Sequence, residues 1–151
     1  MFSVPVPKKS LAFLFLVTVA LPVAIVLMTG GAGWTVFGLV VAVSLAVAGG
    51  TWLVIRSAKV RVEDDGVRLT SLLYSAAIPR KAIERMAFYD RLPEHLEARL
   101  RSNGIGLPGF ALGHFRLKNG GKAFLMCSVP PYAVIDTGEK VYIFSVDGVV
   151  R

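Results

Sequence analysis

Acidic residues are missing from the first 62 positions of this 151-residue chain. All ten Asp and Glu lie beyond them, and with fourteen of the seventeen Lys and Arg they give residues 59–151 a net charge of +4. A positive charge so mixed with acids is not typical of nucleic-acid binders, whose cations gather in one patch. The composition therefore predicts no nucleic-acid partner.

Cysteine and the common catalytic motifs are scarce or missing as well. Cys127 stands alone, so it can form no internal disulfide, and its apolar surroundings predict a small buried hydrophobe. His95 and His114 are nineteen residues apart, and no H-E-x-x-H, C-x-x-C, G-x-S-x-G or P-loop pattern occurs. The acids that could bind a metal are interpreted as turn and surface residues: Asp64, Asp65, Glu94 and Glu97. We expect no catalytic residues, metal or cofactor, and hence no enzyme.

Charged residues are also missing from two long apolar runs, 11–28 and 34–55. A helix needs roughly 20 apolar residues to cross a hydrocarbon core of about 30 Å. The sequence therefore predicts two transmembrane helices joined by a turn. A cleaved signal peptide is the alternative for the first run, since Lys8 and Lys9 precede it, but the run is long and lacks a small-residue cleavage site.

The cations around this predicted transmembrane hairpin indicate its orientation. Lys8 and Lys9 precede it, Arg56 and Lys59 follow it, and the turn between the spans has no positive charge. The positive-inside rule then places both termini in the cytoplasm, with residues 1–10 as a cytoplasmic segment of a multi-pass membrane protein. No ionisable residue lies inside either span, which disfavours transport by this chain alone.

The second span has a ridge of small residues. Four of them recur every four positions, a pattern that allows close helix approach in lipid: Gly38, Ala42, Ala46 and Gly50. The favoured interpretation is packing against the first span. A dimer seam is the alternative.

After Ile55 the hydrophobic period changes from that of a helix to that of a strand. Alternation around Asp64-Asp65-Gly66 predicts a β-hairpin, and the later turn residues predict about seven antiparallel strands in a small barrel or bent sheet. Residues 92–104 interrupt this pattern. Leu92, Leu96 and Leu100 would share one face of a short helix that ends at Asn103-Gly104.

Gly104, Gly106 and Gly109 have the G-x-G-x-x-G spacing of a dinucleotide-binding loop. That motif requires a preceding strand, a following helix and an acid about twenty residues on, and none of these is predicted here. The glycines are therefore interpreted as a structural loop that needs positive φ. Its residues are Gly104, Gly106, Pro108, Gly109 and Gly113.

The stretches RSNGIGLPGFALGHFRLKNGGKAFLMCSV and YAVIDTGEKVYIFS resemble the bacterial PH-like domain family, small pleckstrin-homology-type domains often found beside membrane spans. The matching residues are Arg101, Gly104, Gly106, Gly109, Phe110, Gly113 and Phe115. The resemblance covers residues 59–148 and implies a bent, barrel-like sheet closed by a C-terminal helix. Only DGVVR follows Val146, too short for that helix, so the barrel is predicted to have an open end. The 92–104 helix, the membrane or a partner could cover it.

Together with the resemblance, these patterns predict a non-catalytic interaction or scaffolding module anchored in the bacterial inner membrane. Its expected partners are the lipid bilayer and another protein. Exposed sheet edges and the open barrel end are the expected partner surfaces. One alternative is an accessory subunit of a larger membrane complex. Another is sensing of anionic lipid through a basic face made of Arg80, Lys81, Arg85, Arg99 and Arg101.

Overall fold

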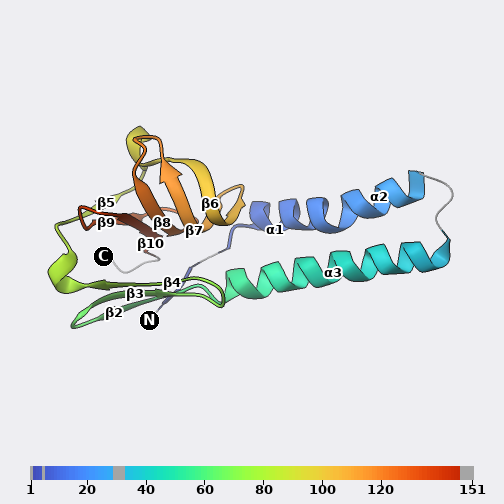
Figure 1. Ribbon diagram of the computed structural model, residues 1–151, viewed down its shortest axis with the longest axis horizontal. Helices are drawn as coiled ribbons and strands as arrows, with labels where there is room; N and C mark the ends of the chain where they lie inside the picture. The colour runs from blue at the N-terminus through green and yellow to red at the C-terminus, as the bar shows by residue number, and fades with distance from the viewer. Residues whose placement is uncertain (1, 5, 29–32, 147–151) are drawn as a thin grey trace.

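A long helical hairpin projects from one end of a β domain in the computed structural model (Figure 1), which describes residues 2–4, 6–28 and 33–146. The first arm is α1 (Lys8–Phe15), η1 (Leu16–Ala20) and α2 (Leu21–Met28), and the second arm is α3 (Trp34–Arg56). Below, the proximal end of the β domain is the end next to these helices, and the distal end is the opposite one.

The first arm widens to a π-helix over η1, just before Pro22. Proline lacks the amide proton of a helical hydrogen bond, and its ring collides with the carbonyl four residues earlier, so a wider turn relieves the crowding. Thr18 Oγ1 donates a hydrogen bond to the Leu14 carbonyl oxygen at 2.6 Å within this region.

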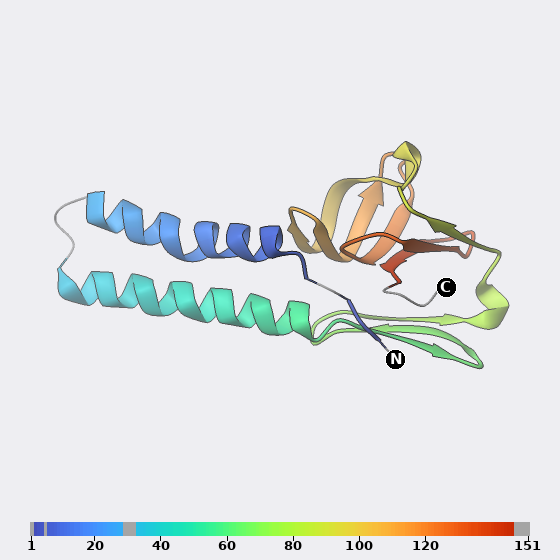
Figure 2. The ribbon, with the colours of Figure 1, turned by 180° about the vertical axis from the view of Figure 1, so that it is seen from behind.

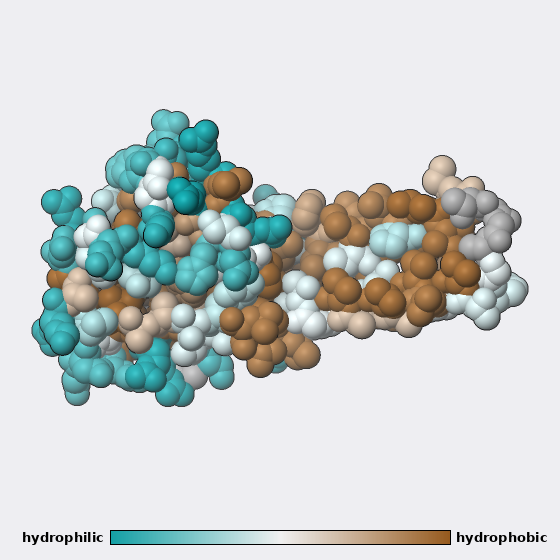
Figure 3. All heavy atoms as spheres, viewed as in Figure 1, coloured by the Kyte–Doolittle hydropathy of each residue, from teal (hydrophilic) through white to brown (hydrophobic). Residues whose placement is uncertain are grey.

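Both arms are long and apolar enough to cross a membrane, with mean hydropathies of 2.8 and 2.2. Only 6% and 17% of their most apolar windows are buried, so neither is the core helix of a soluble domain. Apolar side chains make up most of the visible face of the helical hairpin in Figure 3. This exposed surface suggests association with a membrane.

Nine strands follow the helices in the described chain and form two sheets with one short N-terminal strand, rather than a closed barrel. The mainly-β fold is thus confirmed, although the expected number of about seven strands is too low. Sheet A has the order β1 (Phe2–Ser3), β2 (Lys59–Glu63), β3 (Gly66–Thr70) and β4 (Ser75–Pro79). Sheet B has the order β5 (Arg85–Tyr89), β9 (Tyr132–Asp136), β10 (Val141–Ser145), β8 (Lys122–Cys127), β7 (Phe110–Leu117) and β6 (Ala98–Leu107). The pairing of β8 with β10 is parallel, which the sequence did not indicate.

The N-terminal segment belongs to the β domain. Phe2 pairs with Val60 in an antiparallel ladder, and the Val4 amide donates a hydrogen bond to the Ala58 carbonyl at 3.3 Å. Val4 is 5% exposed and packs in the core, and Figures 1 and 2 show the chain running from sheet A to α1. The predicted separate segment 1–10 is therefore partly a strand of the domain, because its apolar residues find an unpaired neighbour in β2.

The main core lies between the two sheets and extends into the second arm. Val54 and Ile55, in the last turn of α3, are buried there with Leu69 of sheet A and Phe124 of sheet B. The C-terminal end of α3 therefore packs into the core at the proximal end of the domain. On the first arm, Ser10 Oγ donates a hydrogen bond to the Pro108 carbonyl at 2.8 Å and fixes α1 to the β6–β7 turn.

The helix predicted over residues 92–104 is wrong. The segment contains a single 3-10 turn, η3 (Glu94–Leu96), and β6 already begins at Ala98. Leu96 is buried on the outer face of sheet B, whereas Leu100 is 62% exposed, so the leucines do not share a face. Pairing along the whole of β7 outweighs the weak helical pattern, since tertiary contacts override local propensity. This segment covers the outer face of sheet B and not an open barrel end.

Candidate functional site

The glycine-rich motif lies where two paired strands, β6 and β7, approach each other closely. Gly104 of β6 faces Gly113 of β7, and a Cβ on Gly113 would lie 2.6 Å from both the Asn103 oxygen and the Gly104 Cα. A Cβ on Gly104 would collide with the Leu112 carbonyl oxygen. These residues have a structural task, because no side chain fits where the two backbones meet.

The single predicted loop is corrected accordingly. Pro108 and Gly109 form the β6–β7 turn, where Gly109 has φ +77°, while Gly104, Gly106 and Gly113 lie within strands. Of those three, Gly113 alone has a positive φ, +117°. A Cβ on Gly106 would meet its nearest neighbour, Phe115, at an ordinary 3.8 Å.

The structure does not bring the five predicted basic residues together. Arg80 and Lys81 lie in η2 (Arg80–Ala82), at the distal end of the domain in Figures 1 and 2, and Arg85 begins β5. Arg99 and Arg101 lie on β6, and four strands of sheet B separate β6 from β5. A single basic face therefore does not form from this set.

The small-residue ridge of α3 does not pack against the first arm. Its residues Gly38, Ala42, Ala46 and Gly50 are all exposed. Apart from the adjacent backbone of α3 itself, a Cβ added to Gly38 or Gly50 would meet no described atom within 4 Å. Ser44, which does not belong to the ridge, is the buried residue at the middle of α3. The ridge is available to another helix.

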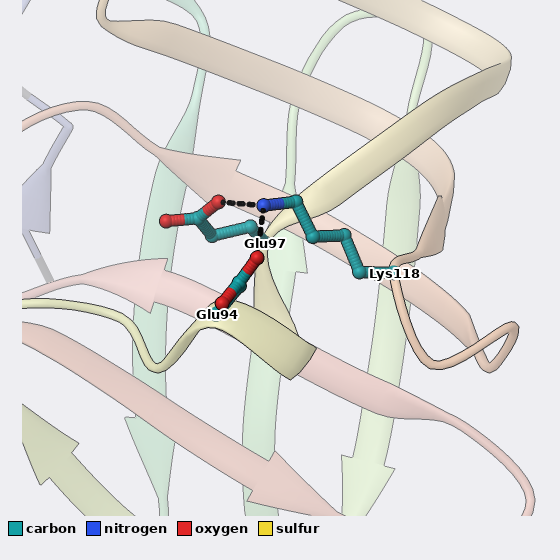
Figure 4. A network of polar contacts seen from close by, with 3 residues as sticks. All are labelled: Glu94, Glu97 and Lys118. Atoms are coloured by element: carbon teal, nitrogen blue, oxygen red, sulfur yellow. Dashed lines mark hydrogen bonds and ion pairs between the residues drawn. The ribbon is translucent and has the colours of Figure 1, made fainter.

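The carboxylates of Glu94 and Glu97 both form ion pairs with Lys118 of the same chain (Figure 4). Lys118 Nζ lies 3.1 Å from Glu94 Oε1 and 2.8 Å from Glu97 Oε2, and the Lys118 amide donates to the Glu97 carbonyl at 3.0 Å. The hydrogen bond from Lys118 lowers the pKa of Glu97 and, in return, raises that of Lys118. The network fastens the η3 segment over the outer face of sheet B.

Cys127 is a buried thiol, as expected. It is 9% exposed in β8, and burial raises its pKa to about 12. Because the thiolate is the reactive form, its reactivity near pH 8 falls by about a thousandfold relative to an exposed thiol. Cys127 therefore serves as a reporter of unfolding and not as a nucleophile.

A polar cluster that sequence reasoning missed joins β7 to β10. Lys140 Nζ lies 3.1 Å from His114 Nδ1 and sits over the rings of Phe124 and Tyr142, 5.5 and 5.3 Å from their centroids. Burial and the Lys140 charge lower the pKa of His114, and burial with the Lys122 charge lowers that of Lys140. The Lys140 ammonium donates a hydrogen bond to the neutral His114 ring and lies over two aromatic rings. These contacts fix the β9–β10 turn to sheet B. Lys140 lies 26 positions from His114 and 16 positions from Phe124, which explains why no local sequence motif marks the cluster.

An apolar groove opens between the sheets along β5. We call it the β5 groove, and its volume is about 270 Å³. Its apolar lining residues are Val62, Val67, Ile83, Met86, Phe88, Phe144 and Val146, with Arg80 and Glu63 at the same opening. Val62, Met86 and Phe88 are 65%, 47% and 51% exposed. The sequence pattern that could have indicated this groove is the alternation in β5, because Met86 and Phe88 point to the same side of the strand.

Both borders of this groove are near sheet edges. Among the described strands, β5 is the outermost of sheet B, with β9 as its neighbour. On the other side, β1 covers only Lys59 and Val60 of β2. An edge strand beside exposed apolar side chains can accept a further strand.

The molecule is thus a helical hairpin joined to a two-sheet β domain with an open lateral groove. No group of three or more His, Cys, Asp or Glu that could bind a metal is assembled within the described ranges. The sequence model of the bacterial PH domain family matches residues 58–147, more than half of the chain, and the chain belongs to this family. The resemblance in the glycine-rich region is therefore confirmed. No curated protein and no solved structure matches the chain.

Proposed function

We propose that this chain is a non-catalytic interaction module that its helical hairpin anchors in the bacterial inner membrane, with both termini in the cytoplasm. The exposed apolar helices support the anchor. The pairing of β1 with β2 supports the topology, because it requires the segments before and after the helical hairpin to lie on the same side. Cleavage after the first arm would remove Val4 from the core, so the pairing also counts against a signal peptide.

The β5 groove is the proposed partner site, and its exposed apolar lining beside an edge strand is the observation that carries this function. A partner's extended segment would add a strand to β5 and bury its alternate side chains against Met86 and Phe88. Main-chain hydrogen bonds supply affinity in such a complex, and the apolar pockets supply specificity. The partner predicted by this chemistry is a protein with an exposed apolar β-segment.

Photocrosslinking in cells tests this site. A benzophenone amino acid at Phe88 of the full chain is expected to give a discrete adduct with one protein. The same probe at Leu100, which is 62% exposed on the opposite edge of sheet B, should give no such adduct.

A double substitution then tests the chemistry of the groove. Met86→Asp with Phe88→Asp should reduce co-purification of the crosslinked protein at least tenfold, while Cys127 stays protected because both side chains are already half exposed. Equal adducts at positions 88 and 100, or undiminished co-purification, would rule the groove out as the partner site.

A second candidate is supported by the exposure of the ridge on α3: an accessory subunit that packs on helices of another membrane protein. Changing all four ridge residues to Leu is expected to release the chain from a complex of fixed stoichiometry in mild detergent, because bulky side chains prevent close helix approach. Val43→Leu with Val47→Leu, at exposed positions that are already large, is the matched control. A complex that survives the ridge substitution excludes this role.

A further inference from the structure

Two consecutive leucines occupy the turn between β3 and β4. Leu72 and Leu73 are each 66% exposed, and neither belongs to a core cluster of the described chain. Turns that face water favour Gly, Asn, Asp, Ser and Pro, whose conformations or side-chain hydrogen bonds suit a tight reversal. Folding of the β domain therefore gives no reason for two large apolar side chains at this position.

The turn is fixed at the foot of α3. The Leu72 amide donates a hydrogen bond to Ser57 Oγ at 2.7 Å, and Ser57 Oγ donates to the Val54 carbonyl at 2.7 Å. Within the turn, the Ser71 amide donates to the Tyr74 carbonyl at 2.7 Å, and the Tyr74 amide donates to Ser71 Oγ at 3.1 Å. The leucines are thus held in place beside the helix end.

The space-filling view places apolar surface at this position. In Figure 3 an apolar patch on the β domain lies beside the base of the helices, and a few paler residues separate it from the apolar surface further along them. Figures 1 and 2 agree that the β3–β4 turn is at the proximal end, next to the last turn of α3. The exposed leucines therefore extend the apolar surface of the helical hairpin onto the domain.

The length of α3 gives the depth of the turn. Trp34 and Trp52 lie eighteen residues apart, which is about 27 Å of helix and close to the thickness of a hydrocarbon core. Ser57 lies five residues beyond Trp52, about 7 to 8 Å further along the axis. With these roughly 27 Å centred in a core of about 30 Å, Ser57 lies roughly 6 Å outside the core, within a headgroup region that is roughly 5 to 7 Å deep.

We infer that Leu72 and Leu73 insert into the interfacial region of the leaflet from which α3 emerges, and so dock the β domain on the bilayer. The inference rests on the proposed membrane anchor. Exposed cations at the same end, Lys9, Arg56 and Lys59, suit the anionic headgroups of such a leaflet. Docking through a third contact besides the two helices holds the domain in one orientation, with the distal end directed away from the membrane.

Depth-dependent fluorescence tests the docking. The full chain carrying Leu73→Cys is labelled with a polarity-sensitive fluorophore, which the buried Cys127 does not compete for, and is reconstituted in phosphatidylethanolamine–phosphatidylglycerol vesicles. Spin-labelled lipids in the same vesicles should quench this probe at least threefold more than a probe at Val62→Cys, which is 65% exposed on β2. Equal quenching at the two positions overturns the inference. A blue-shifted but unquenched probe at position 73 also overturns it, because the side chain would then contact protein.

Carbonate extraction of the same vesicles separates this result from a failure of the anchor. If the chain is extracted, the proposed membrane anchor is wrong. If the chain stays in the membrane while the probes at positions 73 and 62 behave alike, only the docking turn is wrong. Leu72→Asn with Leu73→Asp provides a second measurement, since these residues suit an exposed turn. This variant should stay folded, as shown by protection of Cys127 from thiol labelling. A probe at position 62 should rotate more freely in this variant than in the natural chain.

Discussion

Gly104→Ala is expected to unfold the β domain under conditions in which the natural chain is folded. The added methyl would overlap the Leu112 carbonyl oxygen, which cannot move because it belongs to the adjacent strand of the same ladder. Overpacking alone costs about 1–3 kcal/mol, and forced backbone displacement adds a similar amount. We therefore expect the free energy of unfolding to fall by about 3 kcal/mol or more.

Cys127 supplies the measurement, because it is the sole thiol of the chain and lies in the core. Thiol labelling in detergent at increasing urea gives the unfolding midpoint of the β domain without interference from the helices. Gly106→Ala is the matched control, since its methyl would have only an ordinary contact at 3.8 Å. Similar midpoints for the variants at positions 104 and 106 would contradict the proposed reason for the glycines.

Val4→Asp is expected to destabilise the domain by about 4 kcal/mol, since it places an unpaired carboxylate in the main core. The effect would be unusual for a residue only four positions from the N-terminus, where substitutions are normally tolerated. It arises because β1 and the following residues complete sheet A and its core.

Labelling of Cys127 in urea measures this effect too. Val62→Asp is the control with the same chemical change at a 65% exposed valine, and it should alter the free energy of unfolding by less than about 0.5 kcal/mol. If Val4→Asp behaves like Val62→Asp, the N-terminal segment does not belong to the folded domain, and the topological argument from β1 is lost.

Sequence reasoning was most successful where the pattern is long or the backbone need is specific. The two apolar runs predicted two helices, and the turn at Asp64-Asp65-Gly66 predicted the β2–β3 hairpin. The structural role predicted for the glycines lies mainly in paired strands and not in one loop. Nothing local indicates that Gly104 and Gly113 face one another, because their contact depends on the register of β6 with β7.

The candidate sites were less predictable, since each depends on which elements become neighbours. Arg85 and Arg99 are only fourteen positions apart in the sequence, yet four strands separate β5 from β6. The ridge of α3 shows the same limit: spacing identifies a face of small residues but not what that face contacts. The β5 groove combines residues from both sheets, and only the packing of the sheets creates it.

By itself, the sequence determined the apolar helical hairpin, the mainly-β remainder and membership of the bacterial PH domain family, because uninterrupted hydropathy and family-specific spacing are local properties of the chain. The tertiary structure alone decided that the N-terminus forms a strand, that the ridge faces outward, and that Leu72 lies beside the foot of α3. These outcomes depend on contacts between distant residues, and a strand or turn takes its place only when its partners have formed.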